Sequence, residues 1–170
     1  MSKLKKQIKE KIKMPIIKVS ESIFEKAYVV DALVNPVNCV GVMGKGLAKE
    51  FKERFPENFK VYKMLCENKE LKPGKLLVHY NKYNPKYIIN FPTKDHWKEK
   101  SKLDYIEKGL KTLCIQVNKF KICSISIPAL GCGLGGLKWE DVYKLIVQYM
   151  SSFSLYNNVI VHEPENYSKF

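Results

Sequence analysis

The chain has 170 residues, of which 45% are hydrophobic, and this size and composition predict one compact domain rather than two. Its five cysteines are dispersed and form no C-x-x-C pair, which argues against a disulfide framework or a zinc site and favours a reducing, cytoplasmic compartment. The net charge of +13 is compatible with nucleic-acid contact, but Arg54 is the only arginine, so a lysine-rich genome explains the charge equally well.

The N-terminal residues are rich in lysine. Leu4, Ile8 and Ile12 recur there at helical spacing, so we expect residues 1–14 to form a basic helical extension. Their apolar stretches are too short for a signal peptide or a membrane span, and no membrane contact is expected. Residues 15–170 are expected to form the folded domain, and the absence of a heptad repeat favours a monomer.

Beyond the extension, apolar runs typical of strands alternate with helical patterns, which predicts an α/β domain. In chain order we expect a strand at Pro15–Val19, a strand at Tyr28–Val34, helices at Leu47–Phe55 and Glu57–Asn68, strands at Lys75–Tyr80 and Tyr87–Phe91, a helix at Leu103–Val117, a strand at Ile122–Pro128, a helix at Trp139–Tyr149 and a strand at Asn158–His162.

Two glycine-rich segments each follow a predicted strand and precede a predicted helix. We call Asn35–Gly46 the first glycine segment and Pro128–Gly136 the second. Glycine lets the backbone bring bare N–H groups close to an anion, and a following helix adds its positive end. The first segment is not a Walker A motif, because Lys45 is followed by glycine instead of a hydroxyl residue, and the second comes near the dinucleotide fingerprint but lacks a following βαβ unit. The two segments therefore predict a ligand that carries a diphosphate.

Three motifs, in this order, resemble the macrodomain family and, within it, the DarG-type antitoxin macrodomains. They are the stretches 31–48 (DALVNPVNCVGVMGKGLA), 87–94 (YIINFPTK) and 127–137 (IPALGCGLGGL). The resemblance implies that residues 15–170 form a three-layer α/β/α sandwich with a mixed central sheet. It also implies that ADP-ribose binds between the two glycine segments, without a metal or another cofactor.

The same resemblance implies which residues contact ADP-ribose. Asn38 is expected to bond ribose hydroxyls, the alternative being a turn asparagine that caps its own backbone. Ser22 stands where many macrodomains have an aspartate for the adenine amino group, and a hydroxyl accepts that bond more weakly. The full expected set is Ser22, Ile23, Asn35, Asn38, Val42, Met43, Gly44, Lys45, Gly46, Thr93, Pro128, Leu130, Gly131, Cys132, Gly133, Leu134 and Gly135.

Lys94 aligns with the lysine that DarG-type and terminal ADP-ribose protein glycohydrolases use for catalysis, so the resemblance assigns it the catalytic role. An amine near the anomeric carbon, with a pKa lowered by partial burial, can attack that carbon or stabilise the departing base. Gly135 stands where the terminal ADP-ribose protein glycohydrolases have a catalytic aspartate. This difference favours DarG-like removal of ADP-ribose from modified bases of DNA, with single-stranded DNA as the expected form.

Two other functions would use the same pocket. One is a reader that binds ADP-ribose without cleaving it, and the other is an ADP-ribose-1″-phosphate phosphatase. A third alternative is a toxin-neutralising interaction module, whose partner, by the same resemblance, would be a DarT-type toxin.

Other residues of these segments have open or modest roles. Trp97, beside His96, either stacks on DNA or anchors its loop on the core. Cys39 and Cys132 have no histidine beside them in sequence, so we expect them to fill apolar space instead of acting as nucleophiles.

Overall fold

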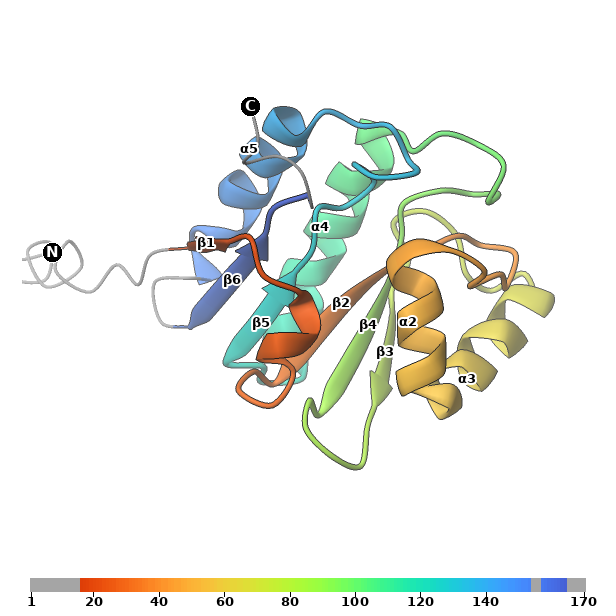
Figure 1. Ribbon diagram of the computed structural model, residues 1–170, viewed down its shortest axis with the longest axis horizontal. Coiled ribbons are helices and arrows are strands. Elements are labelled where there is room, and N and C mark those ends of the chain that lie inside the picture. Colours follow the sequence, from red (N-terminus) through yellow and green to blue (C-terminus); the bar gives the residue numbers. More distant parts are fainter. Residues whose placement is uncertain (1–15, 154–156, 165–170) are drawn as a thin grey trace, which may run out of the picture.

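The computed structural model describes residues 16–153 and 157–164 (Figure 1). The basic extension predicted for residues 1–14 lies outside the described residues. The elements follow the chain as β1 (Ile17–Val19), the 3-10 helix η1 (Ile23–Lys26), β2 (Ala32–Val37), α2 (Gly46–Arg54), α3 (Pro56–Glu67), β3 (Leu77–Tyr80), β4 (Tyr87–Pro92), α4 (Leu103–Lys119), β5 (Ser124–Ile127), α5 (Trp139–Met150) and β6 (Asn158–His162).

The described strands form one six-stranded sheet in the order β1-β6-β5-β2-β4-β3. Neighbouring strands are parallel, except that β3 at one edge pairs antiparallel with β4. Figure 1 shows α2 and α3 on one face of this sheet and α4 and α5 on the other. The predicted three-layer α/β/α sandwich with a mixed central sheet is therefore confirmed.

Side chains of the central strands alternate between the two faces of the sheet. In β2, Ala32 and Val34 belong to the core that α4 and α5 cover, whereas Leu33 belongs to the cluster on the α2 side. In β4, Ile89 belongs to the core that α4 and α5 cover, and Ile88 belongs to the cluster on the α2 side. Because helices cover both faces, these strands are apolar along most of their length instead of alternating with polar residues.

Helix α4 shows how an amphipathic pattern places a helix against the sheet. Its buried side chains recur at helical spacing, and they are Ile106, Leu110, Leu113 and Val117. Charged residues such as Lys111 occupy its exposed face. Within residues 16–153 and 157–164, no helix combines the length and apolar character that a membrane crossing needs.

The strand predicted at Tyr28–Val34 begins and ends later in the structure. Tyr28 and Val29 are exposed and lie in the turn between η1 and β2. The sequence pattern did not indicate η1, because apolar residues in a short turn resemble the start of a strand. This prediction was therefore wrong at the first four residues of the expected strand.

Strand β2 continues through Pro36, which belongs to the first glycine segment. A proline inside a central strand lacks an N–H for the ladder. Here β2 pairs with β4 along its length but with β5 only at Ala32 and Leu33. Pro36 therefore lies where one side of the strand no longer pairs with a neighbour, and the first glycine segment starts as strand and bends only afterwards.

Candidate functional site

Three segments meet at the edge of the sheet where the parallel strands end. The first glycine segment continues from β2, residues 93–102 follow β4, and the second glycine segment follows β5. We call residues 93–102 the linking segment. Because β2 pairs in parallel with both β4 and β5, these segments leave the sheet side by side, where open α/β sheets bind ligands (Figure 1).

Backbone hydrogen bonds connect the linking segment to both glycine segments. The N–H of Cys39 donates to the carbonyl of Asp95 at 2.9 Å, and the N–H of Ser101 donates to the carbonyl of Gly135 at 3.0 Å. The N–H of Thr93 also donates to the carbonyl of Val37 at 2.9 Å. The three segments therefore form one connected surface, although they come from separate parts of the chain.

Asn38 organises the loop of the first glycine segment. Its Nδ2 donates to the carbonyl of Val42 at 2.6 Å, and its Oδ1 accepts from the N–H groups of Val40 at 3.1 Å and Val42 at 3.3 Å. The hydroxyl of Tyr62 donates to the same oxygen at 2.9 Å. In this structure Asn38 thus caps its own loop, the alternative that the sequence left open, while its contact with ribose stays a prediction.

Three fully buried asparagines lie beneath this loop and connect β2, β4 and α3. Asn35 Nδ2 donates to Asn90 Oδ1 at 3.0 Å, and Asn58 and Asn90 exchange bonds of 3.2 Å and 2.6 Å. A buried amide that lost its partner would cost about 1–3 kcal/mol, so these residues depend on one another. Asn35 therefore supports the first glycine segment through its hydrogen bond to Asn90, and its contact with a ligand stays a prediction.

Two glycines of the second glycine segment have opposite surroundings. A Cβ at Gly135 would lie 2.2 Å from both the carbonyl oxygen of Gly131 and Oγ of Ser101, which is too close for any side chain. A Cβ at Gly133 would meet nothing within 4 Å. Gly135 is thus required by close packing, so an aspartate there would demand a different loop, whereas Gly133 borders open space.

Lys94 joins the linking segment to the second glycine segment. Its half-buried side chain places Nζ 3.2 Å from the carbonyl oxygen of Leu134, to which it donates. Burial, together with the positive charge of Lys100, lowers the pKa of the Lys94 amine. A Cβ at Gly46 would lie 3.9 Å from the side chain of Leu134, so the start of α2 is also close. The Lys94 amine therefore contacts the second glycine segment at Leu134, whose side chain lies close to the start of α2.

The thiols of the two glycine segments are poorly suited to nucleophilic attack. Burial raises the pKa of Cys39 to about 12 and that of Cys132 to about 12. A thiol must ionise to attack, so both are unreactive near neutral pH. Among the residues that the structure describes, no three His, Cys, Asp or Glu side chains are grouped to hold a metal ion.

The expected ligand contacts of these segments fall into two groups by exposure. The exposed members are Val42, Gly44, Lys45, Gly46, Gly133 and Leu134. The buried or half-buried members are Asn35, Asn38, Met43, Thr93, Pro128, Leu130, Gly131, Cys132 and Gly135. The exposed residues are available to a ligand in this conformation. The buried and half-buried residues support the loops that carry the exposed ones.

The residues expected at the adenine end lie at the start of η1. Ser22 is exposed, and its Oγ accepts the N–H of Phe24 at 3.3 Å, which caps the 3-10 helix. Ile23 is buried and packs in the cluster that includes Phe51 of α2. Both residues therefore lie on the α2 side of the sheet, and their contact with adenine stays a prediction.

Comparison with known proteins identifies the family of this fold. A model of the Macro domain family matches residues 34–146, which include both glycine segments and Lys94. The chain belongs to the macro domain family. The resemblance expected from the three sequence motifs is therefore confirmed, and the sheet and helix layers described above are those of a macrodomain.

The relatives of this macrodomain include DarG proteins. A DNA ADP-ribosyl glycohydrolase of Mycobacterium tuberculosis is 50% identical over 119 residues, covering 69% of this chain and 34% of the relative. The solved macrodomain of M. tuberculosis DarG matches with a TM-score of 0.82 and 43% identity, covering 87% of this chain and 97% of that one. Thermosipho africanus DarTG in complex with ADP-ribose matches with a TM-score of 0.80 and 35% identity, covering 90% of this chain and 43% of that one. The chain thus spans about a third of the length of the curated relative.

Sequence reasoning missed several residues that support the site of this macrodomain. Asn58 and Tyr62 on α3 hold the first glycine segment, and Ser101 packs under the second. The Oγ of Ser101 is buried and has no hydrogen-bond partner among the described residues. No local signal marks these residues, because each acts on a segment far away in the sequence.

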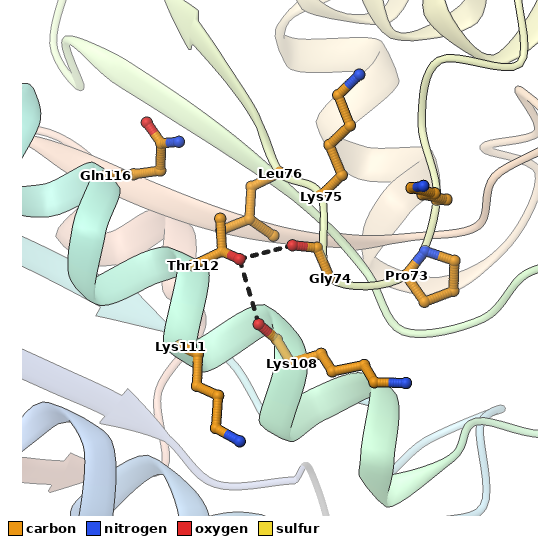
Figure 2. A pocket seen from close by; sticks show the side chains of 9 residues that line it. Pro73, Gly74, Lys75, Leu76, Lys108, Lys111, Thr112 and Gln116 are labelled. Carbon is orange, nitrogen blue, oxygen red and sulfur yellow. Dashed lines mark hydrogen bonds between the residues drawn. The ribbon is translucent and has the colours of Figure 1, made fainter.

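A separate surface hollow of about 580 Å³ lies between α4 and the connection from α3 to β3 (Figure 2). Lys72, Lys75, Lys108 and Lys111 line it, and the hydroxyl of Thr112 donates to the carbonyl of Gly74 at its floor. None of its lining residues belongs to a glycine segment or to the linking segment. This hollow is therefore not part of the candidate site.

Proposed function

We propose that this macrodomain binds ADP-ribose and removes it from modified DNA bases, as an ADP-ribosyl glycohydrolase. The observation that carries the proposal is the position of Lys94, whose amine lies 3.2 Å from the second glycine segment and has a lowered pKa. The name of the M. tuberculosis relative supports the reaction, and the Thermosipho africanus complex supports ADP-ribose as the ligand.

The start of α2 supports binding of the diphosphate. No side chain caps this helix, and its first turn contains no acidic residue. The other three α-helices of the described chain each carry acid in the first turn, namely Glu57, Asp104, and Glu140 with Asp141. The positive end of α2 is thus left uncompensated, and it faces the first glycine segment, where an anion would be stabilised.

The exposed glycines of the two segments would give the diphosphate access to the backbone. Gly44 and Gly46 lie at the start of α2, Gly133 borders open space, and its neighbour Leu134 lies close to Gly46. A ligand held there would place its distal ribose toward Lys94. In the proposed complex the amine would then lie beside the anomeric carbon, where the bond to the base breaks.

Lys94 has two chemical roles available at that carbon. As a neutral amine it would attack the anomeric carbon while the electron pair of the glycosidic bond leaves with the base, which takes up the proton that the amine releases. Water would then hydrolyse the lysine adduct and release ADP-ribose. As an ammonium ion it would instead stabilise the negative charge that develops on the departing base while water attacks the anomeric carbon. The lowered pKa makes the neutral amine easier to reach than in a fully solvated lysine, and the ammonium ion serves the second role. Both roles require Lys94 itself, since the second glycine segment supplies no carboxylate.

The test compares wild type with Lys94→Ala on single-stranded DNA that carries ADP-ribose, on ADP-ribosylated protein and on ADP-ribose-1″-phosphate. Released products are measured by chromatography. We expect wild type to act on the DNA and Lys94→Ala to lose about a hundredfold or more in rate. Lys119→Ala, an exposed lysine at the other end of α4, is the matched control and should retain the wild-type rate.

Each substrate distinguishes an alternative. Tight binding of ADP-ribose by calorimetry with no product from any substrate would show a reader instead of an enzyme. Release of phosphate from ADP-ribose-1″-phosphate, with DNA left intact, would show a phosphatase. A DNA-directed rate that survives in Lys94→Ala would refute the role of the lysine.

The proposal also covers the compartment, the oligomeric state and the protein partner. We place this macrodomain in the cytoplasm as a monomer, with a DarT-type toxin as its counterpart because its relatives include DarG proteins. Size-exclusion chromatography tests the monomer, and co-purification with a DarT-type toxin tests the partnership.

A further inference from the structure

Trp97 is exposed at the middle of the linking segment. The residue is 49% exposed, so it is not buried in the apolar core. The indole stacks instead on the ring of His96, with 5.4 Å between ring centroids and an angle of 30° between the planes. The two rings form an aromatic surface, and the exposure of Trp97 favours the stacking alternative over the core anchor.

Basic residues surround these rings. Lys98 places Nζ 5.1 Å from the centroid of the indole, and the Nζ of Lys100 would lie 3.5 Å from a Cβ at Gly136 in the second glycine segment. Asp95 and Glu99 lie in the same segment, but the lysines at 94, 98, 100 and 102 outnumber them. The surface around the rings therefore carries a net positive charge and attracts an anion.

The rings are held close to the candidate catalytic lysine. His96 follows Lys94 by two residues, and the carbonyl of Asp95 between them accepts the N–H of Cys39 in the first glycine segment. A turn in which the N–H of Glu99 donates to the carbonyl of His96 at 3.0 Å carries Trp97 at its tip. A polymer bound across the glycine segments would thus meet the rings next to its reacting unit.

We propose that His96 and Trp97 form a stacking platform for a base of single-stranded DNA, with Lys98 and Lys100 contacting its phosphates. Every base presents an aromatic face, but only in a single strand is that face open to a protein ring. Cations beside the rings suit the phosphates that flank each base. The proposal extends the proposed function, because the stacked base would be a neighbour of the ADP-ribosylated nucleotide.

The experiment uses unmodified DNA, so that it does not depend on hydrolysis. Only two tryptophans are present, and Trp139 is buried, so quenching of tryptophan fluorescence by an oligodeoxythymidine reports on Trp97. Affinity is measured in parallel by anisotropy of a labelled strand. We expect Trp97→Ala to weaken binding about tenfold and Trp97→Phe to retain most of it, because stacking requires an aromatic ring.

Tyr83→Ala is the matched control. Tyr83 is 71% exposed with Lys82 over its ring, yet it lies in the connection between β3 and β4, at the opposite edge of the sheet from the linking segment. Its removal should leave the affinity unchanged. Higher salt should weaken binding of the wild type, and a duplex of the same length should quench Trp97 less than the single strand does.

Equal affinity of Trp97→Ala and wild type for the single strand would overturn the platform, as would equal losses in Trp97→Ala and Tyr83→Ala. Quenching by an acidic protein but not by DNA would assign the surface to a protein partner and overturn it too. If wild type binds the strand through Trp97 but releases no ADP-ribose from modified DNA, the proposed function fails while the platform stands.

Discussion

Gly133 and Gly135 lie two residues apart in the second glycine segment and differ in what surrounds them. A side chain at 135 would collide with the backbone of Gly131, whereas a side chain at 133 would enter open space. Replacing Gly135 tests the packing of the loop, whereas replacing Gly133 tests binding of the ligand. Asn38 and Asn35 also have structural contacts, because their amides form hydrogen bonds within the protein. The exposed residues of the two segments are instead open to a ligand.

Gly133→Leu is therefore a selective test of the diphosphate site. We expect the variant to bind ADP-ribose at least tenfold more weakly by calorimetry, because the leucine would occupy the open space beside Gly133 that the proposed diphosphate needs. The free energy of unfolding should stay within about 0.5 kcal/mol of wild type, as for other exposed positions. Gly133→Ala should give a smaller loss of affinity. Unchanged affinity in Gly133→Leu would mean that the diphosphate binds elsewhere.

At the scale of elements, the close packing of α4 on β4 depends on Gly109. A Cβ at this position would lie 2.1 Å from Cζ of Phe91, a fully buried ring in β4. The linking segment runs from the end of β4 to the start of α4. The contact between Gly109 and Phe91 thus fixes the distance between the two elements that hold the linking segment, and Lys94 within it.

Gly109→Ala tests this contact. Alanine favours a helix by about 1 kcal/mol over glycine, but overpacking against a buried ring costs about 1–3 kcal/mol. We expect the collision to prevail at 2.1 Å and to lower the free energy of unfolding measured with urea. Ile115→Ala, a change on the exposed face of the same helix, should have an effect within about 0.5 kcal/mol. A more stable Gly109→Ala would show that α4 can shift at no cost.

At the scale of the whole molecule, two histidines link stability to pH. His162 is buried in β6 and His79 is half-buried in β3, and burial lowers the pKa of both below the usual value. The unfolded chain, whose histidines titrate near pH 6.5, then binds more protons than the folded one. The free energy of unfolding should therefore decrease as the pH falls through 6.5 toward the lower pKa of the folded state.

Urea unfolding at pH 7.5, 6.5 and 5.5 measures this dependence. The carboxylates with shifted values, Glu21 and Glu107, have lowered pKa and titrate below this range. In His162→Gln the decrease in unfolding free energy between pH 7.5 and 5.5 should be smaller than in wild type. An equal decrease in both proteins would exclude His162 as a source of the pH dependence.

Much of the fold could be predicted from local patterns. The order of strands and helices, the glycine segments at strand ends and the apolar stripe of α4 all follow from spacing along the chain, because burial of one face imposes a period of two or 3.6 residues. Tyr28 and Val29 were wrongly assigned to a strand, because two apolar residues are too few to show whether a period is present. The family motifs then predicted which segments would bind a ligand.

The sequence by itself determined the elements, their order and the residue types available for chemistry. Only the tertiary structure decided which of them meet. Strand order places β2 between β4 and β5, and this brings Lys94 against Leu134, 40 residues away, and Ser101 under Gly135. It also exposes Trp97 and turns Asn38 toward its own loop. Such contacts depend on long-range neighbours, which the spacing of residues along a single chain does not encode.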